Sequence, residues 1–241
     1  MYQNYIFDLY GTLIDIHTDE RSKNFFKQYV KWLRKQGIYF DWKLFYKLYT
    51  TIEKGHRDRA AKAGKYTNPE IKIEVVLNEI LKTKGYEIPE DQIYFLCQNF
   101  RTISTIYMSL FPDTFACLEE LKKAGKKIYL LSNAQRSFTW QELEMTGLIP
   151  YFDGILISSD EGCMKPDPEF YNICCERYHL QKSESVMIGN ELMSDMAGAK
   201  AAGIDGFFIN RRPVFHAPEE PIYKYVSKNG SLLEVPAQTL R

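Results

Sequence analysis

The sequence predicts an α/β fold with a doubly wound, Rossmann-like parallel sheet, and three features lead to this prediction. Short apolar runs alternate with helical patterns from residue 111 to about residue 210, the order expected of strands joined by crossover helices. A first apolar run at residues 5–9 stands apart from the others. The stretch between them has helical periodicity and hardly any strand signal. We therefore expect a core of residues 1–15 and 111–215, an all-helical domain of residues 16–110, and a C-terminal tail of residues 216–241.

The core elements follow from the alternating pattern in chain order. A helix is expected around Leu118 and Leu121, where apolar residues recur at helical spacing. The remaining core strands are expected at residues 127–131, 154–158, 186–189 and 206–209, and the helices at residues 140–145, 169–178 and 196–202. The segment beyond Arg211 is rich in proline and reads as an appended tail.

The inserted stretch should form several amphipathic helices that end at glycines 37, 64 and 85. The first helix has one apolar face, made of Phe25, Phe26, Tyr29, Val30 and Leu33. Asn68-Pro69 is expected to open another helix, because Asn caps helices and Pro suits the first helical position. The insert is therefore expected to be a compact helical domain over the sheet.

Composition excludes several classes of function. The chain has 241 residues, with 31 Lys and Arg and 31 Asp and Glu, so no net charge steers it toward nucleic acid or an anionic membrane. No run approaches the ~18 apolar residues of a membrane span, and the N-terminus lacks the pattern of a signal peptide. The five cysteines form no CxxC pair, and their odd number argues against a framework in which every cysteine is in a disulfide. We expect a cytoplasmic protein that acts on a small molecule, and a homodimer is compatible with the sequence.

The candidate nucleophile is Asp8, in Tyr5-Ile6-Phe7-Asp8-Leu9-Tyr10-Gly11-Thr12. It follows a buried strand and enters a turn, and open α/β sheets bind ligands beyond the carboxyl ends of their strands. A carboxylate there can attack an electrophilic centre.

Three later segments also follow predicted strands. They are Leu131-Ser132-Asn133, Met164-Lys165-Pro166-Asp167, and Gly189-Asn190-Glu191 with Asp195. Hydroxyl and backbone N–H groups at such turns can hold an anionic oxygen, and a lysine can neutralise it.

These segments resemble the four motifs of the haloacid dehalogenase superfamily, and the helical insert lies where that family carries its C1 cap. The resemblance implies that Asp8 forms a covalent aspartyl intermediate, and that Thr12, Ser132, Asn133 and Lys165 orient the substrate anion. It also implies a cap that closes over the substrate, with hinges expected near residues 16–18 and 110–112.

The resemblance further implies a Mg²⁺ site in the phosphatase branch. Its ligands would be Asp8, the backbone carbonyl of Tyr10 and Asn190, with Glu191 and Asp195 able to compensate for the amide at Asn190. In the phosphatases a second Asp acts as general acid and base at the position of Tyr10, and Tyr is a poor substitute. The candidate catalytic residues are therefore Asp8, Tyr10 and Lys165, with phosphate-ester hydrolysis expected to be weak or atypical.

Two alternatives remain open at this point. The 2-haloacid dehalogenases of the superfamily carry Asp-x-Tyr-Gly-Thr, need no metal, and place a Tyr where Tyr171 stands, six residues after Lys165. Halide leaves without a proton, so Tyr10 costs such an enzyme little. The spacing from Asn190 to Asp195, in contrast, follows the phosphatases. The second alternative is a degenerate protein that keeps the fold and binds a small anion or a protein partner.

Overall fold

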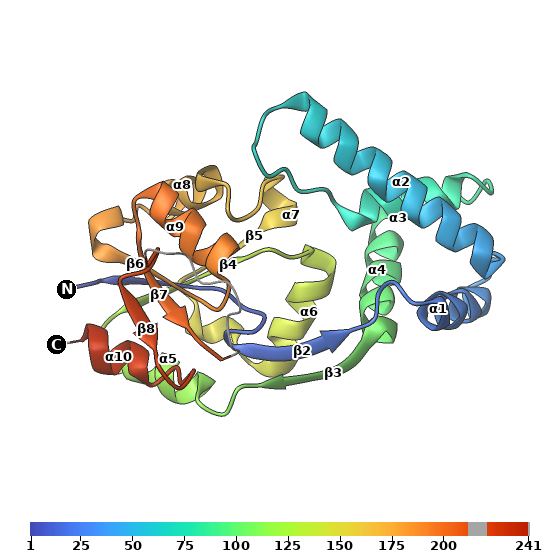
Figure 1. Cartoon of the computed structure of the whole chain (residues 1–241). Helices are drawn as coiled ribbons and strands as arrows, with labels where there is room; N and C mark the ends of the chain where they lie inside the picture. The colour runs from blue at the N-terminus through green and yellow to red at the C-terminus, as the bar shows by residue number, and fades with distance from the viewer. Residues whose placement is uncertain (212–220, 241) are drawn as a thin grey trace.

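A computed structural model describes residues 1–211 and 221–240, and its centre is a six-stranded parallel sheet. The strand order is β5-β4-β1-β6-β7-β8, with β1 in the middle between β4 and β6 (Figure 1). The strands are β1 (Asn4–Phe7), β4 (Lys127–Ser132), β5 (Gly154–Ile157), β6 (Ser185–Gly189), β7 (Asp205–Ile209) and β8 (Tyr225–Ser227). The predicted doubly wound sheet is confirmed.

Helices cover both faces of this sheet because its central strands are apolar on both sides. Tyr5 and Phe7 of β1 pack in one cluster with α5, α6 and α10, whereas Ile6 packs in another cluster with α8 and α9. The core helices are α5 (Thr114–Lys123), α6 (Arg136–Thr146), α7 (Ser158–Glu161), α8 (Pro168–Arg177), α9 (Ala197–Ala202) and α10 (Glu234–Thr239). A single π-helical turn, Leu192–Met196, precedes α9.

The insert is helical, as predicted, and lies to one side of the sheet in Figure 1. Its helices are α1 (Lys23–Lys35), α2 (Trp42–Ala63), α3 (Ile73–Lys82) and α4 (Glu90–Ser104). The predicted apolar face of α1 is buried in a cluster that these helices share, and Phe138 of the core helix α6 joins it. We refer to the segment containing α1–α4 as the cap.

The two connections between cap and core are paired strands: β2 (Ile14–Thr18) and β3 (Thr105–Leu110) form an antiparallel ladder with a register shift at His17/Thr18. The hinges expected near residues 16–18 and 110–112 stay a prediction. One local prediction needs correction. Asn68-Pro69 does not open a helix: α3 begins at Ile73, and the preceding loop is held to the core by the Asp167 carboxylate, which accepts bonds from the backbone of Thr67 and Asn68. A charge-assisted contact to the core thus replaces the predicted capping role.

The segment beyond Arg211 is also more than an appended tail. Its strand β8 extends the sheet beside β7, and α10 packs on α5. Leu232 and Val235 are fully buried in the sheet's main cluster, so apolar burial ties this segment to the core. The part of the predicted tail from residue 216 to 220 lies outside the described residues.

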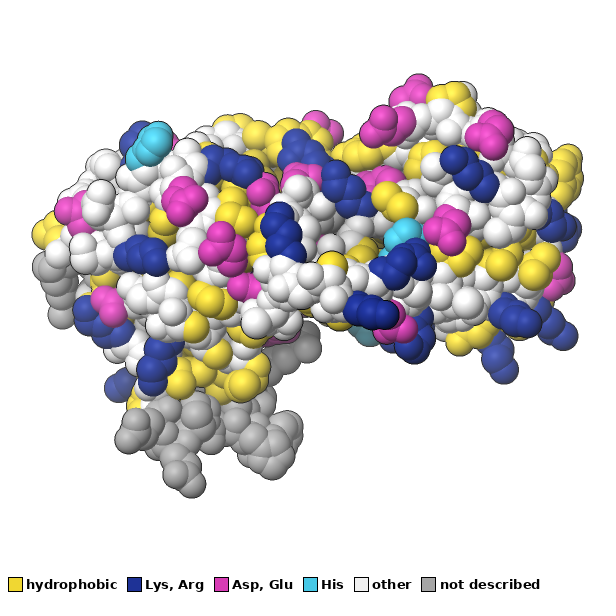
Figure 2. Space-filling model, turned by 90° about the horizontal axis from the view of Figure 1, so that it is seen from above, with side chains coloured by type: hydrophobic (Ala, Val, Ile, Leu, Met, Phe, Trp, Pro, Cys, Tyr) yellow, Lys and Arg dark blue, Asp and Glu magenta, His cyan; other side chains and the backbone are white. Residues whose placement is uncertain are grey.

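Charges of both signs are interspersed on the face shown in Figure 2. Figure 2 shows Lys and Arg side chains interspersed with Asp and Glu over the visible face, in line with the equal numbers of the two charge types. Within residues 1–211 and 221–240, no helix is long and apolar enough to cross a bilayer.

Candidate active site

Asp8 lies directly beyond β1, at the carboxyl edge of the sheet, as the sequence predicts. Its backbone N–H donates to the carbonyl of Ile188 in β6, which carries the strand pairing one residue further. The turn that follows requires Gly11, because its φ of +82° is left-handed and a Cβ there would lie 2.4 Å from the amide nitrogen of Asn190. Close packing of the first and last motifs therefore fixes where the Asp8 carboxylate points.

The Asp8 carboxylate forms a buried charge cluster with Lys165 and Asp195. Lys165 Nζ lies 2.6 Å from Asp8 Oδ1 and 2.7 Å from Asp195 Oδ1, and the lysine side chain is 1% exposed. Burial lowers the pKa of Lys165, but the two carboxylates outweigh this effect, so its pKa is raised above the ordinary value. Burial raises the pKa of Asp195 to about 7, against the opposing effect of Lys165. One buried lysine is thus paired with two carboxylates, of which Asp8 is the more exposed, at 11% against 1% for Asp195.

Thr12 joins Asp8 to the last motif. Its hydroxyl lies 3.0 Å from Asp8 Oδ2 and 3.1 Å from Asn190 Oδ1, and its single proton can be donated to only one of them at a time. The structure therefore brings Asp8, Thr12, Lys165, Asn190 and Asp195 together, although they come from three separate segments.

The two residues of the second motif have different surroundings. Ser132 ends β4, next to β1, and its buried hydroxyl has no hydrogen-bond partner among the described residues. Asn133 is fully engaged, because its amide donates to the carbonyl of Lys165 and accepts from the Lys165 N–H, at 2.9 and 2.8 Å. Ser132 is available to an anion, whereas Asn133 holds the backbone that presents Lys165.

Tyr171 and Glu191 do not point into the charge cluster. The Tyr171 hydroxyl donates to the carbonyls of Ser194 and Asp195, and the ring is fully buried. The exposed Glu191 side chain accepts from the Ser194 hydroxyl, while its backbone N–H donates to Asp195 Oδ2 at 2.9 Å. Both residues support the loop that carries Asp195.

Tyr10 is turned away from Asp8 into a network that we call the cap junction: Tyr10, Thr139, Glu142, Arg101 and Glu20. The Tyr10 hydroxyl lies 2.9 Å from the Thr139 hydroxyl and donates to Glu142. Burial is the largest effect that raises the pKa of Tyr10, and the negative charge of Glu142 adds to it. The predicted catalytic position is therefore occupied by a neutral phenol that is bonded to α6.

Arg101 of the cap completes this junction. Its Nε lies 2.7 Å from Glu142 and its Nη1 2.5 Å from Glu20, while its guanidinium stacks over the Tyr10 ring at 5.3 Å. Sequence reasoning missed Thr139, Glu142, Arg101 and Glu20. In the sequence these four residues look like ordinary polar residues of a helix or loop. The only signal was Tyr10 itself, which differs from the Asp that phosphatases of the family have at this position.

The predicted metal ligands supply few charged oxygens. Asp8 is a carboxylate, but Asn190 offers an amide, Glu191 faces solvent and Asp195 is paired with Lys165. Among the described residues, no group of three or more His, Cys, Asp or Glu side chains is arranged to hold a metal ion. Because Mg²⁺ is bound through carboxylates in an octahedral shell, this donor set does not fit a tight Mg²⁺ site.

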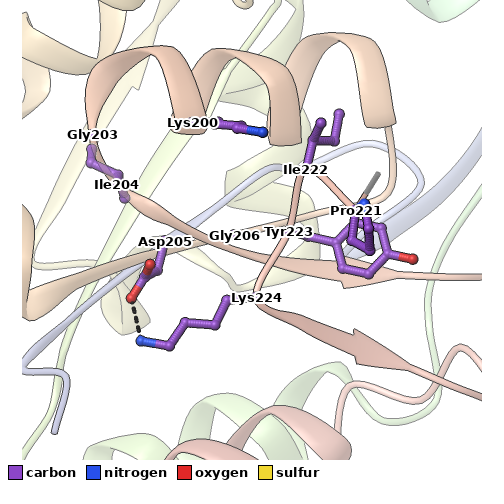
Figure 3. Close-up of a pocket in the computed structure, with 9 residues that line it drawn as sticks. All are labelled: Lys200, Gly203, Ile204, Asp205, Gly206, Pro221, Ile222, Tyr223 and Lys224. Atoms are coloured by element: carbon purple, nitrogen blue, oxygen red, sulfur yellow. Dashed lines mark hydrogen bonds and ion pairs between the residues drawn. The ribbon is translucent and has the colours of Figure 1, made fainter. Parts of the chain in front are cut away.

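Two hollows differ in their relation to these motifs. The hollow in Figure 3, of about 430 Å³, lies at the amino end of β7 and is lined by Lys200, Tyr223 and the Asp205–Lys224 ion pair, with none of the motif residues. A smaller one of about 110 Å³ lies between cap and core, lined by Glu20, Tyr49 and Arg57 and by Gln135, which follows the second motif. The smaller hollow shares Glu20 with the cap junction, but the residues of the charge cluster do not line it.

The fold is a Rossmann-like parallel sheet with a helical cap, and the site is an Asp–Lys–Asp cluster at the carboxyl edge of that sheet. Residues 2–203 match the family model of haloacid dehalogenase-like hydrolases. The protein therefore belongs to this family, as its motifs predicted.

Two relatives that match part of the chain are named as phosphatases. Human N-acylneuraminate-9-phosphatase is 29% identical over 148 residues, which are 61% of this chain and 57% of that protein. Ribulose-1,5-bisphosphate 5-phosphatase from Halopiger xanaduensis is 37% identical over 98 residues, 41% of each chain. The chain spans about half the length of these relatives.

Two solved structures resemble this one over nearly their whole length. A 2-haloacid dehalogenase from Pseudomonas syringae pv. Tomato DC3000 has a TM-score of 0.66 at 21% identity, over the whole of both chains. The magnesium-bound putative HAD-hydrolase YfnB from Bacillus subtilis has a TM-score of 0.56 at 23% identity, covering 98% of each chain. At these identities the likeness establishes the fold.

Proposed function

We propose that this hydrolase acts on a small anionic metabolite by nucleophilic attack of Asp8, and that the group attacked is a phosphoryl group. The observation that carries the proposal is the Asp8 carboxylate at the end of β1, 2.6 Å from the buried ammonium of Lys165. A carboxylate nucleophile splits hydrolysis into two easier steps through a covalent intermediate. The phosphatase activities named for the relatives support phosphorus as the centre attacked.

The other residues of the site bind and orient the anion. The Ser132 hydroxyl is buried and unpartnered in the described structure, so it is free to donate to a phosphoryl oxygen. Lys165 offsets the charge of both Asp8 and the incoming anion, and Asn133 fixes the backbone of Lys165 by two hydrogen bonds. Closure of the cap over the bound anion would limit the entry of water to the molecule needed for the second step.

Mg²⁺ would have to use Asp8, the Tyr10 carbonyl and Asn190, which together supply one negative charge. We therefore propose that any Mg²⁺ effect on turnover is weak, and no step of the mechanism above uses a metal.

Displacement of halide from a 2-haloacid is the second candidate, and Tyr10 favours it. Its hydroxyl is committed to Thr139 and Glu142, so the site lacks an acid two residues beyond the nucleophile. Halide departs without a proton and tolerates that loss. A protein with neither activity would instead be a binding protein that keeps the fold.

The decisive experiment compares Asp8→Asn with Asp15→Asn, a matched change on β2 outside the charge cluster. Turnover of 4-nitrophenyl phosphate and halide release from 2-chloropropionate would be measured with Mg²⁺ and with chelator. Asp8→Asn should abolish turnover of either substrate, and Asp15→Asn should retain it. Undiminished turnover in Asp8→Asn would show that Asp8 is not the nucleophile. Turnover of 2-chloropropionate alone would select the second candidate, and no turnover of either compound would favour a binding role.

A further inference from the structure

The cap junction removes a proton donor from the site, and this bears on which substrates the site can cleave. In a phosphate ester, the leaving oxygen of an alcohol must gain a proton as the bond to phosphorus breaks. A positioned acid typically contributes about 10²–10⁴-fold to such a step. The residue two positions beyond the nucleophile, Tyr10, has its hydroxyl bonded to Thr139 and donating to Glu142 instead.

Tyr10 is held in this orientation from several sides. Glu142 accepts the hydrogen bond from the Tyr10 hydroxyl and is itself paired with Arg101 at 2.7 Å, and the Arg101 guanidinium stacks on the Tyr10 ring. Turning the hydroxyl toward Asp8 would leave the buried Glu142 carboxylate and the Thr139 hydroxyl with fewer partners, which is costly in a protein interior. The side chain is thus fixed in an orientation that does not serve the leaving group.

The other acidic groups near the motifs are also engaged. Asp195 is paired with Lys165 and accepts from the Glu191 N–H, while the Glu191 carboxylate is exposed and bonded to Ser194. Lys165 is held between two carboxylates, which stabilises its protonated form. Asp195 can hold a proton near neutral pH, but Lys165 lies at one of its oxygens and the Glu191 N–H donates to the other, so neither oxygen is left for a leaving group.

We infer that the substrate is an activated phosphate, an acyl phosphate or the phosphate of a weakly basic hydroxyl, whose leaving group departs as an anion without protonation. This inference rests on the proposed function and narrows its substrate class. Simple alkyl phosphates, whose alkoxide must be protonated, are poor substrates for this site.

The chemistry balances without an acid. Asp8 Oδ forms a bond to phosphorus as the bond from phosphorus to the leaving oxygen breaks, and the bonding pair leaves with the carboxylate or aryloxide anion. Water then attacks the phosphorus of the aspartyl phosphate. Its oxygen and both protons depart with dihydrogen phosphate, and the electron pair of the P–O bond to Asp8 returns to the carboxylate.

The test measures kcat/KM of the full-length protein for acetyl phosphate, 4-nitrophenyl phosphate, phenyl phosphate and glycerol 2-phosphate, in order of rising leaving-group basicity. A fall of at least ~10³-fold along the series is expected, because the missing acid matters only for the basic leaving groups. A flat series would overturn the inference and leave the proposed function standing. No turnover of any of the four would overturn both.

Two variants of Tyr10 separate this account from a hidden role of the phenol. Tyr10→Phe keeps the ring and should leave the steepness of the series unchanged. Selective loss of glycerol 2-phosphate turnover in that variant would make the Tyr10 hydroxyl the acid and refute the inference. Tyr10→Asp should raise glycerol 2-phosphate turnover by ~10²-fold or more while changing acetyl phosphate less than ~10-fold.

Tyr10→Asp places a carboxylate beside Glu142, so Tyr10→Asp with Glu142→Gln is the matched variant that removes the like charge. An unchanged circular dichroism spectrum would show that both variants fold. If neither folded variant then gains activity on glycerol 2-phosphate, the absence of an acid does not restrict the range of substrates, and the inference is wrong. The wild-type series decides the inference even if neither variant folds.

Discussion

The charge cluster around Asp8 and the cap junction around Tyr10 start two residues apart in the chain but have different designs. In the first, Lys165 bridges two carboxylates at 2.6 and 2.7 Å and leaves the adjacent Ser132 hydroxyl free. In the second, a guanidinium bridges two carboxylates at 2.5 and 2.7 Å, and every named polar group has a partner.

The two networks differ in whether they leave a polar group without a hydrogen-bond partner. The charge cluster contains a buried hydroxyl, that of Ser132, without a partner among the described residues. In the cap junction, hydrogen bonds and ion pairs join Arg101 and Glu20 of the cap to α6 and to the turn after Asp8. Tyr10, two residues beyond Asp8, is thus part of the connection between cap and core.

The largest expected effect tests that structural role through Arg101→Met. Removing the guanidinium leaves Glu142, 7% exposed, without its counter-ion, and breaking a buried pair in this way costs about 3–5 kcal/mol. The free energy of unfolding would be measured by urea titration. The comparison variant is Arg59→Met, whose side chain is 64% exposed and lies 3.9 Å from Glu79, itself 48% exposed, so that a cost under about 1 kcal/mol is expected.

Equal losses in the two variants would show that the cap junction is an ordinary surface network. The double variant Arg101→Met with Glu142→Gln should recover part of the loss, because the stranded carboxylate is then absent. Failure of this recovery would place the cost of Arg101→Met in lost packing against the Tyr10 and Phe138 rings instead.

Much of the fold and of the charge cluster could be predicted because both depend on local patterns. The strands after which Asp8, Ser132 and Asn190 stand are apolar runs of the right length, and parallel strands bring their carboxyl ends to one edge. The cap helix α1 was predicted from one apolar face, which the structure buries. These features need only the periodicity of the chain.

The rest depends on contacts between distant segments. Nothing local shows that Glu142 lies under Tyr10, 132 residues earlier in the chain, or that Arg101 reaches both Glu142 and Glu20. The pairing of β2 with β3 could not be predicted either, because it joins segments about 90 residues apart and both strands are short. Strand β8 escaped prediction because three residues carry too little pattern.

Asn190→Asp is the next largest expected effect and asks whether the charge cluster is one carboxylate short of a metal site. The added carboxylate would face Thr12 and Asp8, so Mg²⁺ affinity should rise by ~10-fold or more, about 1.4 kcal/mol. Isothermal titration calorimetry measures the affinity. Thermal unfolding with and without Mg²⁺ should show a stabilisation by Mg²⁺ that the wild type lacks.

Asn99→Asp on α4 is the control for Asn190→Asp, since it adds the same charge outside the site, where the amide bonds only the Phe95 carbonyl. It should leave Mg²⁺ affinity unchanged. If Asn190→Asp also left it unchanged, the geometry of the charge cluster, and not the missing charge, would be what excludes a metal.

The smallest expected effect concerns Asp113, which supports the turn after Asp8 from the side opposite the cap junction. Asp113 accepts from Arg211, from the Ser231 hydroxyl and from the Leu232 N–H, and Arg211 also lies 3.4 Å from the Thr12 carbonyl. Burial alone would raise the pKa of Asp113, but the bonds from Leu232, Ser231 and Arg211 outweigh it and lower the pKa below its ordinary value.

Because the folded-state pKa of Asp113 is lowered, its contribution to stability is present above the unfolded-state pKa and is lost as pH falls through the folded-state value. Asp113→Asn should therefore cost about 1 kcal/mol at pH 7, because the amide oxygen still accepts hydrogen bonds but carries no charge, with the gap to wild type narrowing below about pH 4. Asp58→Asn, in an exposed helical pair, should stay within about 0.5 kcal/mol at either pH. A gap for Asp113→Asn that did not change with pH would mean that the Asp113 carboxylate is not bound as its contacts indicate.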